Sequence, residues 1–209
     1  MFCRGVSSYL FLASLATAHF NIQYPEVRGD VFAENASQRI FPCANVDQTS
    51  ETNRTQWPLD GGSVSLKLYH SWTYIFINLG LGSENPKFNV SLTPNLLKET
   101  GKGDFCLPKL TLPKDLVPEE GQNASIQVVA VGPRGDAFYS CSDITFSKNA
   151  TIQSEEVCTN STGVNAVTIS SSSGPNIPSP PHSGSSIRFE SSVGAAFAAV
   201  LGAIVMGHF

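Results

Sequence analysis

The sequence is poor in charged residues, and it lacks both a cluster of basic residues and a pair of closely spaced cysteines. Only 14% of its 209 residues are Asp, Glu, Lys or Arg, and the net charge is -4. The 13 basic residues form no cluster, so we expect no nucleic-acid partner. There is no Cys-x-x-Cys pair, which disfavours a zinc site. No segment shows the periodicity of an amphipathic helix, so we expect a protein built from strands.

The N-terminus has the features of a secretory signal peptide. A basic residue, Arg4, precedes the apolar run 10–15, and Ala16-Thr17-Ala18 matches the small-residue cleavage site. We therefore expect residues 1–18 to be removed, which leaves His19 as the first residue of the mature chain. Composition alone places a histidine there in roughly one secreted protein in twenty to fifty. A histidine at position 19 therefore indicates a metal site only if the chain supplies a second ligand.

The C-terminal part has the composition of a linker followed by an anchoring signal. Residues 159–186 are rich in Ser, Pro and Thr and cannot build a core. Small residues at 183–185, a polar spacer and an apolar end match a GPI-attachment signal, which we assign to residues 187–209. A single transmembrane helix is the alternative, but the apolar stretch is short for one. We expect anchoring at the outer face of the plasma membrane, with the cell wall as the alternative location.

Cysteine content and glycosylation motifs support a secreted protein. Cys3 leaves with the signal peptide, and an even set of four cysteines remains: Cys43, Cys106, Cys141 and Cys158. Two disulfides are expected in a secreted chain. The sequence does not choose among the three possible pairings; we favour Cys43–Cys141 with Cys106–Cys158.

Six sites match the N-glycosylation rule and are expected to face solvent. They are Asn35, Asn53, Asn89, Asn123, Asn149 and Asn160.

Alternating apolar and polar side chains between turn signals predict a domain of short strands over residues 19–158. The fold class is all-β, an antiparallel immunoglobulin-like or fibronectin-III-like sandwich with disulfides. A single helical turn is expected at 96–100. The predicted strands are 20–24, 63–69, 73–79, 88–92, 124–131 and 137–146.

Histidines are few, and their positions point to a metal site. His182 falls in the predicted linker and His208 in the predicted anchor signal, so only His19 and His70 belong to the folded domain. If the first strand packs beside His70, the α-amine and two imidazoles form a T-shaped three-nitrogen site, a histidine brace. Such a set favours Cu(II), and we expect one ion per chain. Asp143 is the candidate oxygen ligand. Taken singly, His70 also fits an ordinary half-buried histidine, and Asp143 a surface or turn carboxylate.

Motifs spread over nearly the whole predicted domain carry a family resemblance. They are His19-Phe20-x-x-x-Tyr24-Pro25-x-x-Arg28-Gly29, Phe41-Pro42-Cys43, Trp57-Pro58-x-x-Gly61-Gly62, Phe105-Cys106-Leu107-Pro108, Asn123-Ala124-Ser125-Ile126-Gln127-Val128-Val129 and Tyr139-x-Cys141-x-Asp143-Ile144. In these motifs the chain resembles the fungal copper-acquisition factors, which are secreted and GPI-anchored and are similar to lytic polysaccharide monooxygenases. It departs from the usual pattern at Ala44-Asn45, where the family has two glycines.

The resemblance implies a sandwich that holds one copper ion through His19, His70 and Asp143. It also implies copper uptake at the cell surface, with a membrane copper transporter as the hypothetical partner and a monomeric chain. A copper-binding protein is therefore expected rather than an enzyme. The alternative is a copper-dependent oxidative enzyme, such as a lytic polysaccharide monooxygenase, acting on cell-wall glycans. A weaker alternative is a structural cell-wall mannoprotein.

Overall fold

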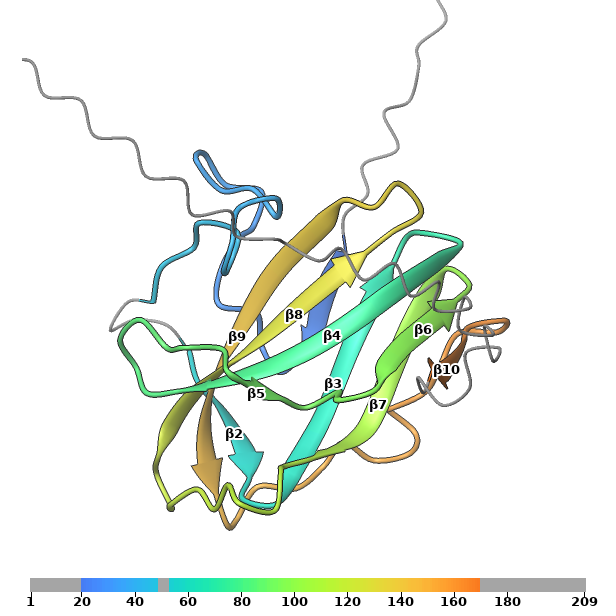
Figure 1. The fold of residues 1–209 in the computed structure, drawn as a ribbon. Coiled ribbons are helices and arrows are strands. Elements are labelled where there is room, and N and C mark those ends of the chain that lie inside the picture. The colour runs from blue at the N-terminus through green and yellow to red at the C-terminus, as the bar shows by residue number, and fades with distance from the viewer. Residues whose placement is uncertain (1–19, 49–52, 170–209) are drawn as a thin grey trace, which may run out of the picture. The chain divides into compact units, whose positions relative to one another are not determined.

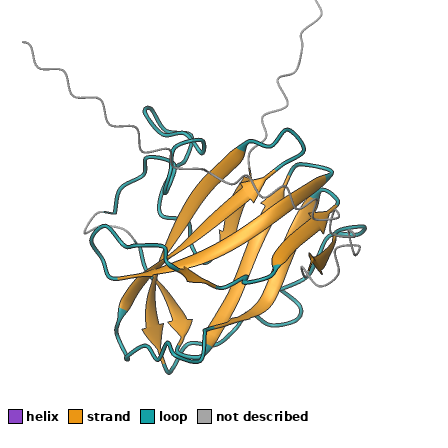
Figure 2. Ribbon diagram, viewed as in Figure 1, coloured by secondary structure: helices purple, strands orange, loops and turns teal. Residues whose placement is uncertain are grey.

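The structure is a computed structural model that describes residues 20–48 and 53–169. Within these residues all regular secondary structure is strand (Figure 2). In chain order the strands are β1 (Phe20–Tyr24), β2 (Thr55–Pro58), β3 (Gly61–Leu68), β4 (Trp72–Leu81), β5 (Val90–Ser91), β6 (Leu96–Thr100), β7 (Gly103–Thr111), β8 (Asn123–Val131), β9 (Ala137–Ser147) and β10 (Asn165–Ile169).

The strands form two sheets that pack as a sandwich (Figure 1). The smaller sheet has the order β1-β3-β7, and the larger has the order β10-β6-β4-β8-β9-β2, with β5 added beside β4. The predicted all-β sandwich is therefore confirmed. One pair differs from the antiparallel expectation, because β2 runs parallel to β9. Residues 25–54 separate β1 from β2, so no tight hairpin dictates the direction of β2.

The core lies between the sheets and follows the alternation seen in the sequence. Val64, Leu66 and Leu68 of β3 are at most 1% exposed, and Ile75 and Ile77 of β4 face them from the other sheet, fully buried. Successive side chains of a strand point to opposite faces, so one apolar set per strand is enough to fill this interior.

Two disulfides fix long-range connections, and both match the favoured pairing. Cys43 bonds to Cys141, which ties the loop between β1 and β2 to β9. Cys106 bonds to Cys158, which ties β7 to the segment that precedes β10. Their Cα–Cα separations, 5.2 and 5.3 Å, are in the usual range for disulfides.

Two local expectations are wrong. The expected helical turn at 96–100 is strand β6, paired with β4 and β10; Leu97 and Glu99, two residues apart, both point inward with the period of a strand. The sheet also extends past the predicted end of the domain at 158, because β10 lies in the segment expected to be linker. Its sequence Asn-Ala-Val-Thr-Ile contains three β-branched residues, which favour strands.

The predicted signal peptide and anchor signal lie outside the described residues. Along 20–48 and 53–169 there is no helix long and apolar enough to cross a membrane.

Candidate metal centre

His70 lies in the turn between β3 and β4, half-buried, and is the first component of the site. His19 lies outside the described residues, but Phe20, which follows it, is the first residue of β1. Phe20 pairs with Leu68, the last residue of β3. The start of β1 is therefore held beside the end of β3, two residues before His70 (Figure 1). This arrangement of strands is the one that the predicted brace requires.

The turn between β8 and β9 closes over His70 from the other sheet. His70 lines a small hollow together with Gly132, Arg134, Asp136 and Phe138. A Cβ atom added to Gly132 would lie 2.7 Å from Cδ2 and 2.8 Å from Nε2 of the imidazole. The ring therefore packs directly on the backbone at Gly132, and only glycine leaves room for it there.

Asp136 is a carboxylate beside His70 that sequence reasoning missed. It lies next to Ala137, whose partner Val131 is paired in turn with Tyr74 near the start of β4, and this register brings the turn to His70's end of the sheet. Asp136 makes an exposed ion pair with Arg39 at 3.2 Å. The predicted strands 124–131 and 137–146 leave a turn at 132–136 between them, but nothing in a hairpin turn distinguishes a metal ligand from an ordinary solvated carboxylate.

Asp143, the predicted oxygen ligand, is not brought to His70. It lies six residues along β9 from Ala137, a path of about 20 Å at the rise of a strand. Its side chain is fully buried.

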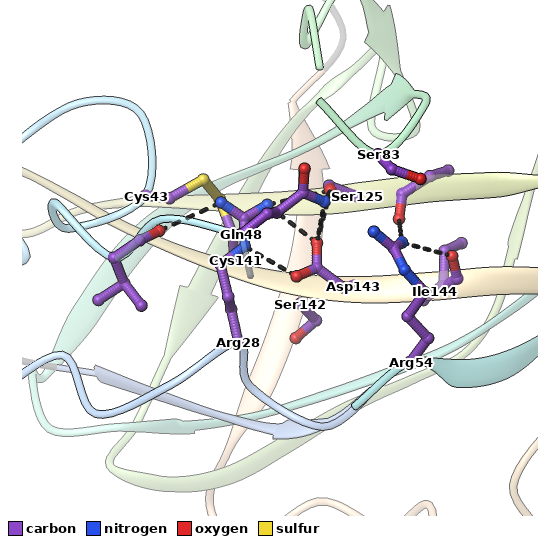
Figure 3. Close-up of polar contacts among 12 residues, drawn as sticks. Arg28, Cys43, Gln48, Arg54, Ser83, Ser125, Cys141, Ser142, Asp143 and Ile144 are labelled. Atoms are coloured by element: carbon purple, nitrogen blue, oxygen red, sulfur yellow. Dashed lines mark hydrogen bonds and ion pairs between the residues drawn. A yellow bond between two sulfur atoms is a disulfide. The ribbon is translucent and has the colours of Figure 1, made fainter. Parts of the chain in front are cut away.

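The oxygen atoms of Asp143 are already occupied by a polar network (Figure 3). Arg28 donates from Nε to Oδ2 and from Nη2 to Oδ1, both at 2.9 Å. Ser125 donates to Oδ1 at 2.6 Å and Gln48 at 2.7 Å. Burial acts to raise the pKa of Asp143, but the hydrogen bonds from these three residues and the charge of Arg28 outweigh it and hold the pKa below its ordinary value. This arrangement argues against Asp143 as a copper ligand.

The donor set near His70 fits copper only in part within the described chain. No group of three or more His, Cys, Asp or Glu side chains that could hold a metal occurs in residues 20–48 and 53–169. His70 and Asp136 supply one imidazole and one carboxylate, both of which suit Cu(II). The remaining nitrogen ligands of the predicted brace belong to His19.

The N-glycosylation motifs remain predictions, and their surroundings differ. Five of the six asparagines are exposed, namely Asn35, Asn53, Asn89, Asn149 and Asn160. Asn123 is half-buried; its side chain donates to Ser83 and accepts from Thr145. A glycan at Asn123 would be attached to Nδ2, the atom that donates to Ser83.

Comparison with known proteins agrees with the sequence motifs. The profile of the family described as "Copper acquisition factor BIM1-like" matches residues 17–163. An uncharacterised protein of Aspergillus fumigatus is 36% identical over 167 residues, which cover 76% of this chain and 65% of that protein. The lytic polysaccharide monooxygenase-like protein ham-7 of Neurospora crassa is 36% identical over 185 residues, 77% of this chain and 80% of its own.

A more distant relative carries a functional name. The copper acquisition factor BIM1 of Cryptococcus neoformans is 25% identical over 159 residues, 71% of this chain and 69% of that protein. The region that the family profile matches includes β1 to β9 and the turns around His70. The chain therefore belongs to the BIM1-like family of copper acquisition factors.

Proposed function

We propose that this protein captures one Cu(II) ion outside the cell and delivers it toward copper uptake. The observation that carries this proposal is the pairing of Phe20 with Leu68. That pairing holds Phe20, the residue after the proposed N-terminus, beside Leu68, two residues before His70. Asp136 lines the same hollow as His70.

The proposed ligands are the α-amine and imidazole of His19 with the imidazole of His70. The carboxylate of Asp136 takes the place that the sequence assigned to Asp143. Amine, imidazole and carboxylate ligands in a tetragonal arrangement favour Cu(II) over Zn(II), which prefers a tetrahedron. Affinity falls below neutral pH, because both imidazoles and the amine must lose protons before they bind.

Binding and delivery fit the surroundings of His70 better than oxidative cleavage of glycans. A carboxylate beside the metal stabilises Cu(II) over Cu(I) and takes up space that a reacting oxygen molecule needs. Trp72 and Tyr74, a half-buried aromatic pair at the start of β4, meet edge to face with an interplanar angle of 63°. Lys98 lies over the Trp72 ring at 5.3 Å. These rings do not share one plane, so they do not form the flat platform on which a polysaccharide stacks.

The cellular setting is part of the proposal. A removed signal peptide and a GPI anchor place the protein at the outer face of the plasma membrane, where a membrane copper transporter is the natural recipient of the ion. The described domain then acts as a monomer outside the membrane.

The test is copper binding by the secreted protein with its native N-terminus. We expect sub-micromolar Cu(II) affinity and an axial electron paramagnetic resonance spectrum with nitrogen coupling. One added alanine before His19 moves the α-amine away and weakens binding by orders of magnitude, because a chelate is much tighter than its separate donors. His70→Ala has a comparable effect, whereas the control His182→Ala has none. Equal affinity in the alanine-extended protein excludes the brace, and oxidised oligosaccharides released from wall glycans favour the enzymatic alternative.

A further inference from the structure

Gln38 is a buried glutamine whose side chain acts as a partner for the first residue of β1. It lies in the loop between β1 and β2 and is 1% exposed. The Phe20 N–H donates to Gln38 Oε1 at 3.3 Å, and Gln38 Nε2 donates to the Phe20 carbonyl at 2.7 Å. One side-chain amide thus supplies both the acceptor and the donor that a neighbouring strand would offer.

The Gln38 amide provides hydrogen-bond partners on the side of β1 that has no neighbouring strand. β1 is the edge strand of the three-stranded sheet, and β3 pairs with it along one side only. The first residues of a domain fray unless something ties them down. Because Phe20 is 2% exposed, water cannot replace a lost partner, and each buried backbone group left unpaired costs about 1–3 kcal/mol.

Gln38 is itself fixed to the larger sheet. Its carbonyl accepts a hydrogen bond from the Tyr139 N–H of β9 at 2.7 Å. Five residues later, the Cys43–Cys141 disulfide joins the same loop to β9. Phe20 is therefore held between β3 on one side and, through Gln38, β9 on the other.

We propose that Gln38 is a positioning residue for copper, in that it holds the peptide group that joins His19 to Phe20. This proposal rests on the proposed function. A peptide group is planar, so fixing the Phe20 N–H also fixes the direction in which the chain leaves toward His19. A chelate formed by a chain terminus gains affinity when that terminus is held in place before the ion arrives, because less ordering is then needed on binding.

The experiment compares two buried glutamines in the secreted protein. Gln38→Met keeps the length of the side chain and removes both hydrogen bonds to Phe20. Gln127→Met is the matched control: Gln127 is 2% exposed, accepts from Asn78 and donates to the Pro42 carbonyl. It contacts the same loop but not Phe20. The readouts are hydrogen exchange of the Phe20 amide in metal-free protein, Cu(II) affinity by chelator competition, and the paramagnetic spectrum at saturating Cu(II).

In Gln38→Met we expect exchange at Phe20 to accelerate at least tenfold, Cu(II) affinity to fall about tenfold or more, and the copper spectrum to change. Gln127→Met retains wild-type values in all three. Unchanged exchange at Phe20 in Gln38→Met overturns the contact. Faster exchange with unchanged affinity and spectrum overturns the positioning role while leaving copper binding intact. A wild-type protein that binds no copper overturns both this role and the proposed function.

Discussion

Arg28 and Asp143 form a buried ion pair in which two nitrogens of the guanidinium meet both oxygens of the carboxylate. The side chains are 6% and 0% exposed. Arg28 also donates to the Val46 carbonyl and to Ser125, so the pair joins the loop after β1 to strands β8 and β9. Arg28 belongs to an Arg-Gly-Asp tripeptide, and its inward direction leaves that tripeptide without the exposed guanidinium that receptor recognition needs.

Removing the arginine is expected to destabilise the fold strongly. Arg28→Met leaves the Asp143 carboxylate buried without a counter-charge, which typically costs about 3–5 kcal/mol. Lys109→Gln removes one partner of the exposed Lys109–Asp60 pair and should change stability by less than about 1 kcal/mol. Denaturant unfolding measures both. Similar losses in the two variants would mean that the Arg28 pair is solvated.

Substitutions of Asp136 and Asp143 should affect different properties, the first copper affinity and the second stability. Asp136→Asn removes the charge beside His70 and is expected to weaken Cu(II) binding about tenfold, with little effect on unfolding because Asp136 is partly exposed. Asp143→Asn leaves Arg28 buried and unpaired, so it lowers the free energy of unfolding while the folded protein keeps its copper affinity. Chelator competition and denaturant titration on both variants test this. The reverse pattern would return Asp143 to the metal site.

Glu99 is a buried carboxyl group without a hydrogen bond of regular geometry. It is fully buried on β6, and in the described chain its carboxyl oxygens make at most a weak contact with the hydroxyl of Thr73, its cross-strand neighbour. Burial raises the pKa of Glu99 from 4.5 to about 7, with the Thr73 hydroxyl acting in the opposite direction. The group is therefore close to half-protonated at neutral pH.

The raised pKa predicts that stability declines as the pH rises. Below pH 4.5 the carboxyl is protonated in both states, whereas between 4.5 and about 7 the unfolded chain ionises first, so the free energy of unfolding falls. Glu99→Gln cannot ionise and should be about 1–3 kcal/mol more stable than wild type at pH 8, with no advantage at pH 4. The exposed control Glu84→Gln should follow wild type. Parallel pH profiles for wild type and Glu99→Gln would refute the assignment.

The close approach at Gly132 gives a test of the His70 environment. In Gly132→Ala the new methyl group meets the imidazole at 2.7 Å, so the ring must move, and copper affinity should fall at least tenfold. Pro133→Ala, at the exposed neighbouring position, is the control. Chelator competition measures affinity, and one-dimensional NMR confirms folding. An unchanged copper spectrum in Gly132→Ala would show that the ring has room to spare.

Local sequence patterns predicted the strands in which apolar and polar residues alternate. These are β3, β4, β8 and β9, whose predicted bounds lie close to those in the structure. β7 was missed because Pro108 interrupts its sequence, and proline normally argues against a strand. β10 was missed because its five residues border a Ser/Pro-rich segment that dominates the composition.

The sequence could predict only the part of the metal site that depends on the order of the strands along the chain. His70 follows a strand and Phe20 begins one, so their proximity needed only the pairing of β1 with β3. The prediction of Asp143 rested on its proximity to Cys141, and Asp136 was not considered. Arg28, which forms the ion pair with Asp143, lies 115 positions away in the sequence, and no local pattern indicates that contact.

The departure from the family pattern at Ala44 and Asn45 has a structural consequence that can be tested. Both residues have a left-handed backbone, with φ of 61° and 59°, and such conformations cost a residue with a Cβ about 1–2 kcal/mol. Ala44 cannot relax, because its N–H donates to the Ile40 carbonyl and its carbonyl accepts from Ser37. The two glycines of the family pattern avoid this cost.

Ala44→Gly should therefore stabilise the protein by about 0.5–1 kcal/mol, the relief of strain less the extra chain entropy of glycine. The control Ala137→Gly, in β9 where φ is not positive, should destabilise it by a similar amount, because there glycine brings only its entropy cost. Urea unfolding of both variants measures the difference. Destabilisation by Ala44→Gly would mean that the fully buried Ala44 methyl group contributes more through packing than its backbone strain costs.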